Sequence, residues 1–179
     1  MTELAIGGEP GFEVSLADAP SPDGKPNYTL ETLQTLRAGL PPGGSLFCLM
    51  GADSFVSLRR WHGAAGIPFV ASLIVASRPG RQLDDLTRFL PRGLTLEPAA
   101  AVPSVSSPPP TPQIELRSHT LRSPEGKSAP FYLLPGLDVE ISASEIRNQV
   151  HSSAQDPAVT SSLLPAPVAD YIRTHHLYR

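Results

Sequence analysis

The stretch SLFCLMGADSFVSLRRWHGAAGIPFVASLIVA, residues 45–76, decides the fold class. It opens with one short apolar run, Ser45–Met50, and closes with a second, Phe69–Ala76. Continuous apolar runs of this length are typical of strands buried on both faces of a parallel sheet. Between them, Asp53–Arg60 and Trp61–Ile67 have helical patterns. The order strand, helix, strand predicts a right-handed crossover and therefore an α/β fold with a parallel sheet.

Toward the N-terminus, three further elements are expected. Met1–Ile6 has the pattern of a short helix, and Phe12–Ala17 alternates apolar and polar residues as a half-buried strand does. Thr29 is a candidate N-cap for a helix that reaches Leu40. Pro41 and the residues after it end that helix.

Toward the C-terminus, strands and helices are expected in turn. The ranges are a surface helix at 82–90, strands at 113–116, 131–134 and 139–141, a helix from Ser142 or Ser144, and a helix at Pro165–His175 with Val168, Tyr171 and Ile172 inward. The intervening stretch Glu97–Pro112 holds six prolines. Because proline removes ladder donors and fixes φ, this stretch is expected to be a disordered insertion. The chain of 179 residues is otherwise expected to form one domain, residues 1–179.

Charge and composition exclude several classes of partner. The net charge of −3 gives no electrostatic case for nucleic acid or an anionic membrane. The longest apolar run, Ile67–Ala76, is too short for the roughly 20 residues of a membrane span. The single cysteine, Cys48, cannot form a disulfide within the chain, which favours a cytoplasmic location. The sequence does not indicate an oligomeric state.

A first candidate ligand site follows the strand at Ser45–Met50. Ligands of open parallel sheets bind outside the carboxyl ends of strands. Gly51 there lets a ligand approach the backbone, and the Asp53 carboxylate can accept both hydroxyls of a ribose. The alternative is that Asp53 only caps the helix after it.

A second candidate site is Ile141–Arg147, where a strand end leads into a helix. The hydroxyls of Ser142 and Ser144, the free N–H groups of the helix N-terminus and the guanidinium of Arg147 suit a phosphate. Ser142 and Glu145 also stand in the relation of a capping box, so a purely structural role is equally compatible with the spacing.

A third candidate group combines Tyr28 and Thr29 with Trp61 and His62. The only tryptophan of the chain lies in a polar-flanked segment, where its ring could stack on a planar heterocycle. A lone tryptophan is more often part of the core, and that alternative stays open. Zinc-type clusters of Cys and His, a Gly-x-Ser-x-Gly elbow and a phosphate loop ending in Gly-Lys-Ser/Thr are absent from the sequence.

Taken in order, these segments resemble the bacterial nicotinate-nucleotide adenylyltransferase family. The matching segments are Met1–Ile6, Asn27–Thr29 with Thr32-Leu33, Leu49–Leu58 with Trp61-His62, Arg78–Gly80, Ile141–Arg147 and Leu164–Arg179. Single motifs among them are weak, but six in the same order are specific.

The resemblance implies a Rossmann-like nucleotidyltransferase fold and adenylyl transfer from ATP to nicotinate mononucleotide, with Mg²⁺. Tyr28 and Thr29 would lie beside the nicotinate, Trp61 would stack on its ring, and His62 would flank it. Carried over in the same way, Asp53 and Gly51 would hold ribose, and Ser142, Ser144 and Arg147 would bind the ATP phosphates.

One family motif has no counterpart in this sequence. Family members carry a Gly-Gly-Thr-Phe-Asp-Pro-x-His-x-Gly-His loop in a first β-α-β unit, whereas no two histidines here stand three residues apart. We therefore expect an incomplete first unit, unknown catalytic residues and impaired transfer. The alternatives are a non-catalytic remnant or binding module that holds nucleotide or nothing, and an enzyme of the pantetheine-phosphate type. The second explains Ile141–Arg147 but not Tyr28 with Trp61.

Overall fold

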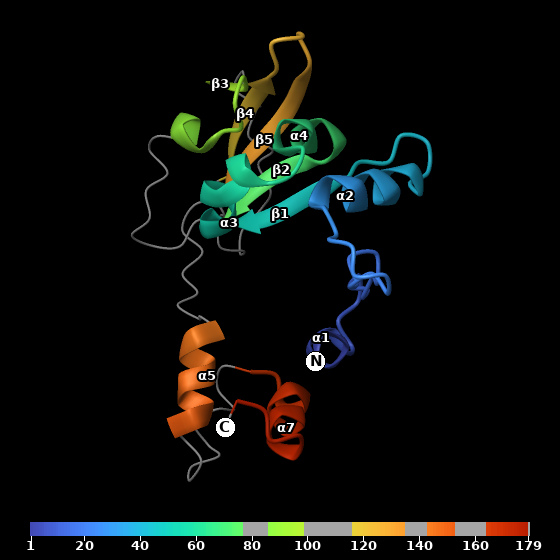
Figure 1. Cartoon of the computed structure of the whole chain (residues 1–179), viewed down its shortest axis with the longest axis vertical. Helices are drawn as coiled ribbons and strands as arrows, with labels where there is room; N and C mark the ends of the chain where they lie inside the picture. The colour runs from blue at the N-terminus through green and yellow to red at the C-terminus, as the bar shows by residue number, and fades with distance from the viewer. Residues whose placement is uncertain (77–85, 99–115, 135–142, 153–163, 179) are drawn as a thin grey trace, which may run out of the picture. The chain divides into compact units, whose positions relative to one another are not determined.

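The computed structural model describes residues 1–76, 86–98, 116–134, 143–152 and 164–178 of the chain (Figure 1). The chain divides into two compact units. The sheet unit comprises Ala17–Asp138, and the helical unit comprises Met1–Leu16 together with Val139–Arg179.

The sheet unit is built on a five-stranded sheet in the order β1-β2-β5-β4-β3. The strands are β1 (Phe47–Gly51), β2 (Ser72–Ala76), β3 (Thr95–Pro98), β4 (Arg117–Arg122) and β5 (Ser128–Leu134). β1, β2 and β5 are parallel, with Met50 opposite Val75 and Val75 opposite Leu133. β4 pairs antiparallel with β5, and β3 pairs antiparallel with β4. The predicted α/β fold with a parallel sheet is confirmed, and the antiparallel strands add to it.

The crossover between β1 and β2 also follows the prediction. It runs through α3 (Ala52–Ser57), the 3₁₀ turns η1 (Leu58–Arg60) and η2 (Ala64–Gly66), and α4 (Ile67–Val70). The strand predicted at Phe69–Ala76 begins later in the structure, at Ser72, because Phe69 and Val70 belong to α4. Pro68 lies in the first turn of α4, where its fixed φ favours a helix and its missing N–H is not needed.

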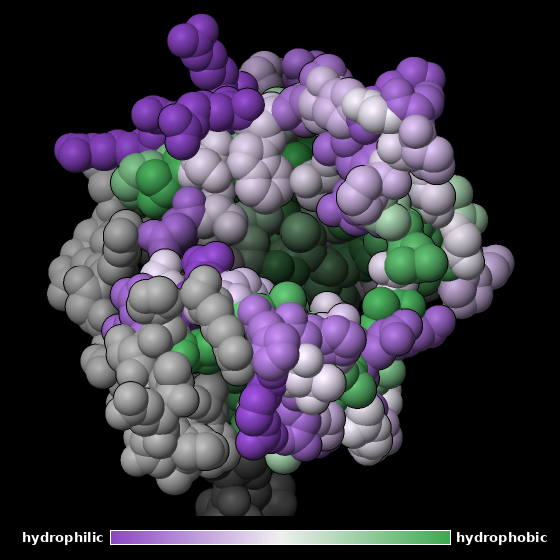
Figure 2. Space-filling model, turned by 60° about the horizontal axis from the view of Figure 1, so that its bottom comes forward, coloured by the Kyte–Doolittle hydropathy of each residue, from purple (hydrophilic) through white to green (hydrophobic). Residues whose placement is uncertain are grey.

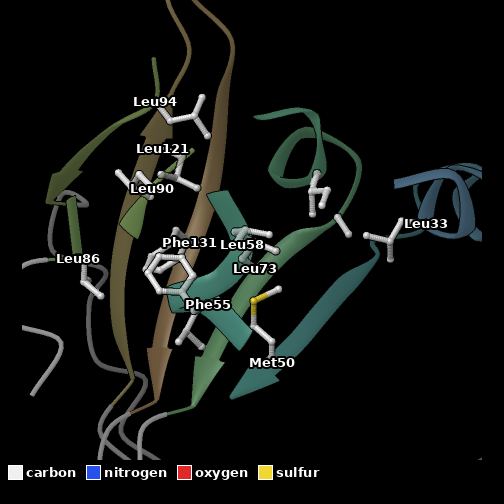
Figure 3. Packing of buried hydrophobic residues seen from close by; sticks show 13 residues of the cluster. Leu33, Met50, Phe55, Leu58, Leu73, Leu86, Leu90, Leu94, Leu121 and Phe131 are labelled. Carbon is white, nitrogen blue, oxygen red and sulfur yellow. The ribbon is translucent and has the colours of Figure 1, made fainter. Parts of the chain in front are cut away.

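One face of the sheet carries the core (Figure 3). Side chains from α3 and from the inward face of the strands meet there, with the Phe55 and Phe131 rings 5.5 Å apart between their centroids. On the other face of β1, Phe47 and Leu49 are 50% and 67% exposed. Apolar side chains therefore reach the surface on this face. Figure 2 shows one side of the molecule, with hydrophobic residues in green among hydrophilic ones in purple.

The helix α2 (Thr29–Ala38) precedes β1. The prediction of Thr29 as its N-cap is wrong, because Tyr28 has the extended backbone of the cap position. The carbonyl of Tyr28 accepts hydrogen bonds from the N–H groups of Glu31 and Thr32, which starts the helix one residue earlier. Leu33 is buried in the core, and the Thr32 hydroxyl donates to the Asp18 carboxylate at 3.0 Å.

The helical unit contains α1 (Thr2–Ile6), α5 (Ala143–Ser152) and α7 (Ala166–Thr174). All three match helices that the sequence predicted. Val168 and Ile172 of α7 are buried as expected, but Tyr171 is exposed and its ring contacts that of His175. Among the described residues, every helix is too short or too polar to cross a bilayer.

The predicted strand at Phe12–Ala17 is wrong. These residues form no strand, and Phe12 and Leu16 are 69% and 80% exposed. Alternation alone does not make a strand, since the backbone N–H and C=O groups also need a neighbouring strand. Within the described residues, no ladder of the sheet includes this segment.

The remaining differences concern the second half of the sheet unit. The predicted surface helix at 82–90 is only a 3₁₀ turn, η3 (Leu86–Phe89), where it is described, and Leu86 and Leu90 are buried in the core. Of the strand expected at 113–116, only Leu116 is described, and it directly precedes β4; residues 113–115 lie outside the described residues. Glu97 and Pro98, the start of the proline-rich stretch, belong to β3. Residues 99–112 and 139–141 lie outside the described residues.

A pH dependence of stability follows from His119 on β4. Burial, and then the neighbouring Arg117 cation, lower the pKa of His119 below its ordinary value of 6.5. The unfolded chain therefore binds this proton more readily than the folded chain. We expect the wild-type stability to fall as the pH drops below 6.5 toward the folded pKa, and His119→Gln to reduce that fall. Denaturant midpoints above and below this range, followed by Trp61 fluorescence, measure it. An identical fall in both proteins would contradict it.

Candidate functional site

The backbone at the carboxyl end of β1 is not covered by the residues that the structure describes. Gly51, the last residue of β1, is the N-cap of α3, and a Cβ placed on it would meet no atom within 4 Å. Asp53 lies exposed in the first turn of α3, where the helix dipole favours a carboxylate. Because Gly51 holds the cap position, Asp53 is not the N-cap residue that the alternative interpretation required.

Two of the predicted site residues come together in an aromatic stack. The rings of Tyr28, at the N-cap of α2, and His62, between η1 and η2, lie 4.1 Å apart between centroids at an interplanar angle of 26°. Tyr28 is half-buried and His62 is exposed. Thr29 begins α2 directly after Tyr28 and is half-buried as well. These residues form a surface of planar rings and hydroxyls at one end of α2.

Part of the Trp61 side chain packs against the core. Its indole ring is half-buried and packs against the core cluster, and its Nε1 donates a hydrogen bond to the Ser57 hydroxyl at 3.1 Å. Ser57 in turn donates to the carbonyl of Ser54 at 2.8 Å. A buried indole usually finds such a partner for its N–H group. The geometry thus favours the core interpretation for Trp61, while its neighbour His62 faces solvent.

The phosphate-binding candidates lie on α5 of the helical unit. Arg147 Nη2 donates to the Ser144 hydroxyl at 3.5 Å, and both side chains are exposed. Arg147 also lines a cavity of about 330 Å³ with Met1, Val168 and Ile172. Ser144 and Arg147 therefore lie one turn apart at the start of α5, as the motif predicted. Ser142 and the segment 78–80 lie outside the described residues.

Sequence reasoning missed the residues that bring Tyr28 and His62 together. Leu30 of α2 lies directly against the backbone of Gly63, next to His62. The glycine after His62 was a possible signal, because Gly63 has a φ of +62°, a conformation that favours glycine. The sequence could not show which residue lies against it, because Leu30 is distant in the chain.

The described residues also limit how a metal ion could be held. Within the described ranges, no group of three or more His, Cys, Asp or Glu side chains could hold one.

Comparison with known proteins places the whole chain in one family. The probable nicotinate-nucleotide adenylyltransferase of Stenotrophomonas maltophilia is 35% identical over 100% of this chain and 72% of its own length. The chain belongs to the nicotinate-nucleotide adenylyltransferase family. The probable adenylyltransferases of Aeromonas salmonicida and Xylella fastidiosa are 34% and 33% identical, again over 72% of their length. No family model matches the chain.

A solved structure of an adenylyltransferase has a fold similar to that of this chain. Plasmodium falciparum nicotinic acid mononucleotide adenylyltransferase, complexed with APC, matches with a TM-score of 0.54 at 15% identity. The match covers 89% of this chain and 62% of the solved one. The predicted family, the nucleotidyltransferase fold and the prediction of an enzyme of NAD biosynthesis are confirmed. The roles of individual residues stay predictions.

Proposed function

We propose that the chain binds ATP, as its magnesium complex, and nicotinate mononucleotide, and transfers the adenylyl group between them. A phosphate oxygen of the mononucleotide attacks the α-phosphorus of ATP, the bond from that phosphorus to the bridging oxygen of the β-phosphate breaks, and pyrophosphate leaves. The products are deamido-NAD and pyrophosphate. The observation that carries this proposal is the similarity of the whole chain to relatives named for this activity.

The acceptor site of the proposal is the surface formed by Tyr28, Thr29, Trp61 and His62. The stacked rings of Tyr28 and His62 present a planar, partly exposed surface that suits the pyridine ring of nicotinate. The Thr29 hydroxyl and the free N–H groups at the start of α2 suit its carboxylate. In this assignment Trp61 supports the surface from the core side.

For the nucleotide, the residues of each unit are assigned by themselves. Asp53, with the open backbone of Gly51 beside it, would accept the ribose hydroxyls. Ser142, Ser144 and Arg147 would contact the phosphates, with charge-assisted hydrogen bonds from the guanidinium. Catalysis of phosphoryl-type transfer is mostly positioning and neutralisation of spread charge, so these contacts are the main contribution we assign to the protein.

The proposed location is the cytoplasm, and the proposed partners are the two substrates without nucleic acid or membrane. The single cysteine, Cys48, carries a free thiol, and burial raises its pKa. A thiol of raised pKa is less reactive at neutral pH, as suits a structural residue in a reducing compartment.

Binding and turnover, measured on the same 179-residue chain, test the proposal. Titration calorimetry should detect nicotinate mononucleotide and magnesium-ATP, while pyrophosphate release measures transfer. The impaired transfer expected from the missing histidine pair stays a prediction, and binding without turnover is the outcome of the non-catalytic alternative. Failure to bind nicotinate mononucleotide would contradict the proposed substrate.

Substitution at Tyr28 tests the acceptor site itself. Tyr28→Ala removes one ring of the stack, so we expect affinity for nicotinate mononucleotide to fall by about 1–1.5 kcal/mol while affinity for ATP is unchanged. Trp61→Leu keeps an apolar side chain at the neighbouring position and serves as the contrast. If calorimetry shows that only Trp61→Leu weakens the mononucleotide, the stacking surface is Trp61 and the Tyr28 assignment is wrong.

A further inference from the structure

A close contact joins the first turn of α2 to the turn after Trp61. A Cβ placed on Gly63 would lie 2.4 Å from Cδ2 of Leu30, and within 3.7 Å of its Cγ and Cβ. A Cβ on Gly66 would lie 3.5 Å and 3.6 Å from the two methyl groups of the same leucine. The Leu30 side chain therefore rests on bare backbone, where a side chain at position 63 would occupy the same space.

The contact sits at the base of the aromatic stack. Leu30 follows Tyr28 by two residues, and Gly63 directly follows His62. The φ of +62° at Gly63 turns the chain so that His62 faces Tyr28 while the next residues lie on Leu30. Only glycine combines this backbone conformation with so close an approach.

We infer that Leu30 and Gly63 are positioning residues that fix the Tyr28–His62 stack in the acceptor site. The inference rests on the proposed function for what the stack binds, but not for the stack itself. Neither residue is assigned a contact with substrate, because both act through the two rings. Ordinary core packing of Leu30 is the competing explanation, and it predicts a loss of stability with no selective effect on the acceptor.

Gly63→Ala is the first variant, and Gly126→Ala is its matched control. Gly126, in the turn between β4 and β5, has a φ of +81°, but a Cβ there would meet nothing within 4 Å. Both variants strain the backbone, and only Gly63→Ala also collides with a neighbour. The nearest atom, Cδ2, is the free end of the Leu30 side chain, so the collision is relieved mainly by displacement of that side chain from Gly63.

Two readouts separate positioning from stability. The first is the nuclear magnetic resonance shift of the His62 ring protons, which feel the ring current of Tyr28, with Tyr28→Leu as the unstacked reference. We expect Gly63→Ala to move these shifts toward the reference and Gly126→Ala to leave them unchanged. The second is affinity by calorimetry. Disturbing the stack cannot cost more than removing one of its rings, so we expect Gly63→Ala to weaken nicotinate mononucleotide by about two- to tenfold and magnesium-ATP hardly at all.

Leu30→Ala removes the contact from the other side without straining the backbone, and it carries the test if Gly63→Ala fails to fold. The double variant should be less than additive in its effect on the acceptor, since both changes break one contact. Unchanged His62 shifts in both single variants, or equal weakening of both ligands, would overturn the inference. If the wild-type chain binds no mononucleotide, the proposed function fails, while the His62 shifts still decide whether Leu30 and Gly63 hold the stack.

Discussion

Phe131→Ala is expected to lower the free energy of unfolding of the sheet unit by about 3–5 kcal/mol. Phe131 lies on β5, the central strand of the sheet, and is 0% exposed. Its ring packs against Phe55 of α3 and lies edge-on to His119 of β4. Because these neighbours are fixed in a helix and a second strand, they cannot close the space that the ring leaves. The loss therefore includes a cavity as well as the lost burial of the ring.

Phe47→Ala is the matched control for this prediction. Phe47 is also a phenylalanine on a strand of the same sheet, but it is half exposed and lies on the opposite face. Its ring contacts Tyr132 at 6.3 Å between centroids, so a smaller loss is expected. Denaturant unfolding followed by the fluorescence of Trp61, the only tryptophan, reports on the sheet unit. Equal losses in the two variants would show that the buried face is not the core, and Phe131→Leu covers the case in which Phe131→Ala does not fold.

The parallel part of the sheet could be predicted because its signal is local. The runs that became β1 and β2 are almost entirely apolar and end at glycine or alanine, a pattern that favours parallel strands. Burial on both faces was wrong for β1, because it is an edge strand of the described sheet and its Phe47 and Leu49 are exposed. β3 could not be predicted in this way. Only its Leu96 is even partly buried, and its place in the sheet is decided by pairing with β4, where Glu97 forms an ion pair with Arg122. Such pairing leaves no periodic pattern in the strand itself.

The residues of the candidate site could be predicted from the sequence, but the arrangement of their side chains could not. The motif placed Tyr28 and His62 in one pocket, but their direct stack depends on the packing of Leu30 against Gly63. The same limit applies to Trp61. Its exposure and its hydrogen bond to Ser57 are set by the turn that η1 makes, so the sequence alone left the core and the ligand interpretations open.

Arg147→Ala is expected to reduce ATP affinity by about 1.5–3 kcal/mol, roughly 10- to 150-fold, with little change in thermal stability. The size is that of a hydrogen bond to a charged group, which the guanidinium would donate to a phosphate. Arg147 is exposed, and polar contacts of an exposed side chain contribute little to stability, so its loss should cost the fold little. Calorimetric titration with magnesium-ATP and a thermal melt of the same preparation measure the two effects.

Arg173→Ala is the control that separates a phosphate site from general loss of positive charge. Arg173 lies exposed on α7 of the same unit and pairs with Asp170, so its removal changes the net charge equally without touching α5. Long-range electrostatic attraction of ATP would fall similarly in both variants and would weaken with salt. A direct contact would be lost only in Arg147→Ala. If instead ATP affinity is unaltered and the melting temperature falls, Arg147 and Ser144 serve to stabilise the start of α5, and the capping interpretation of Ile141–Arg147 is the correct one.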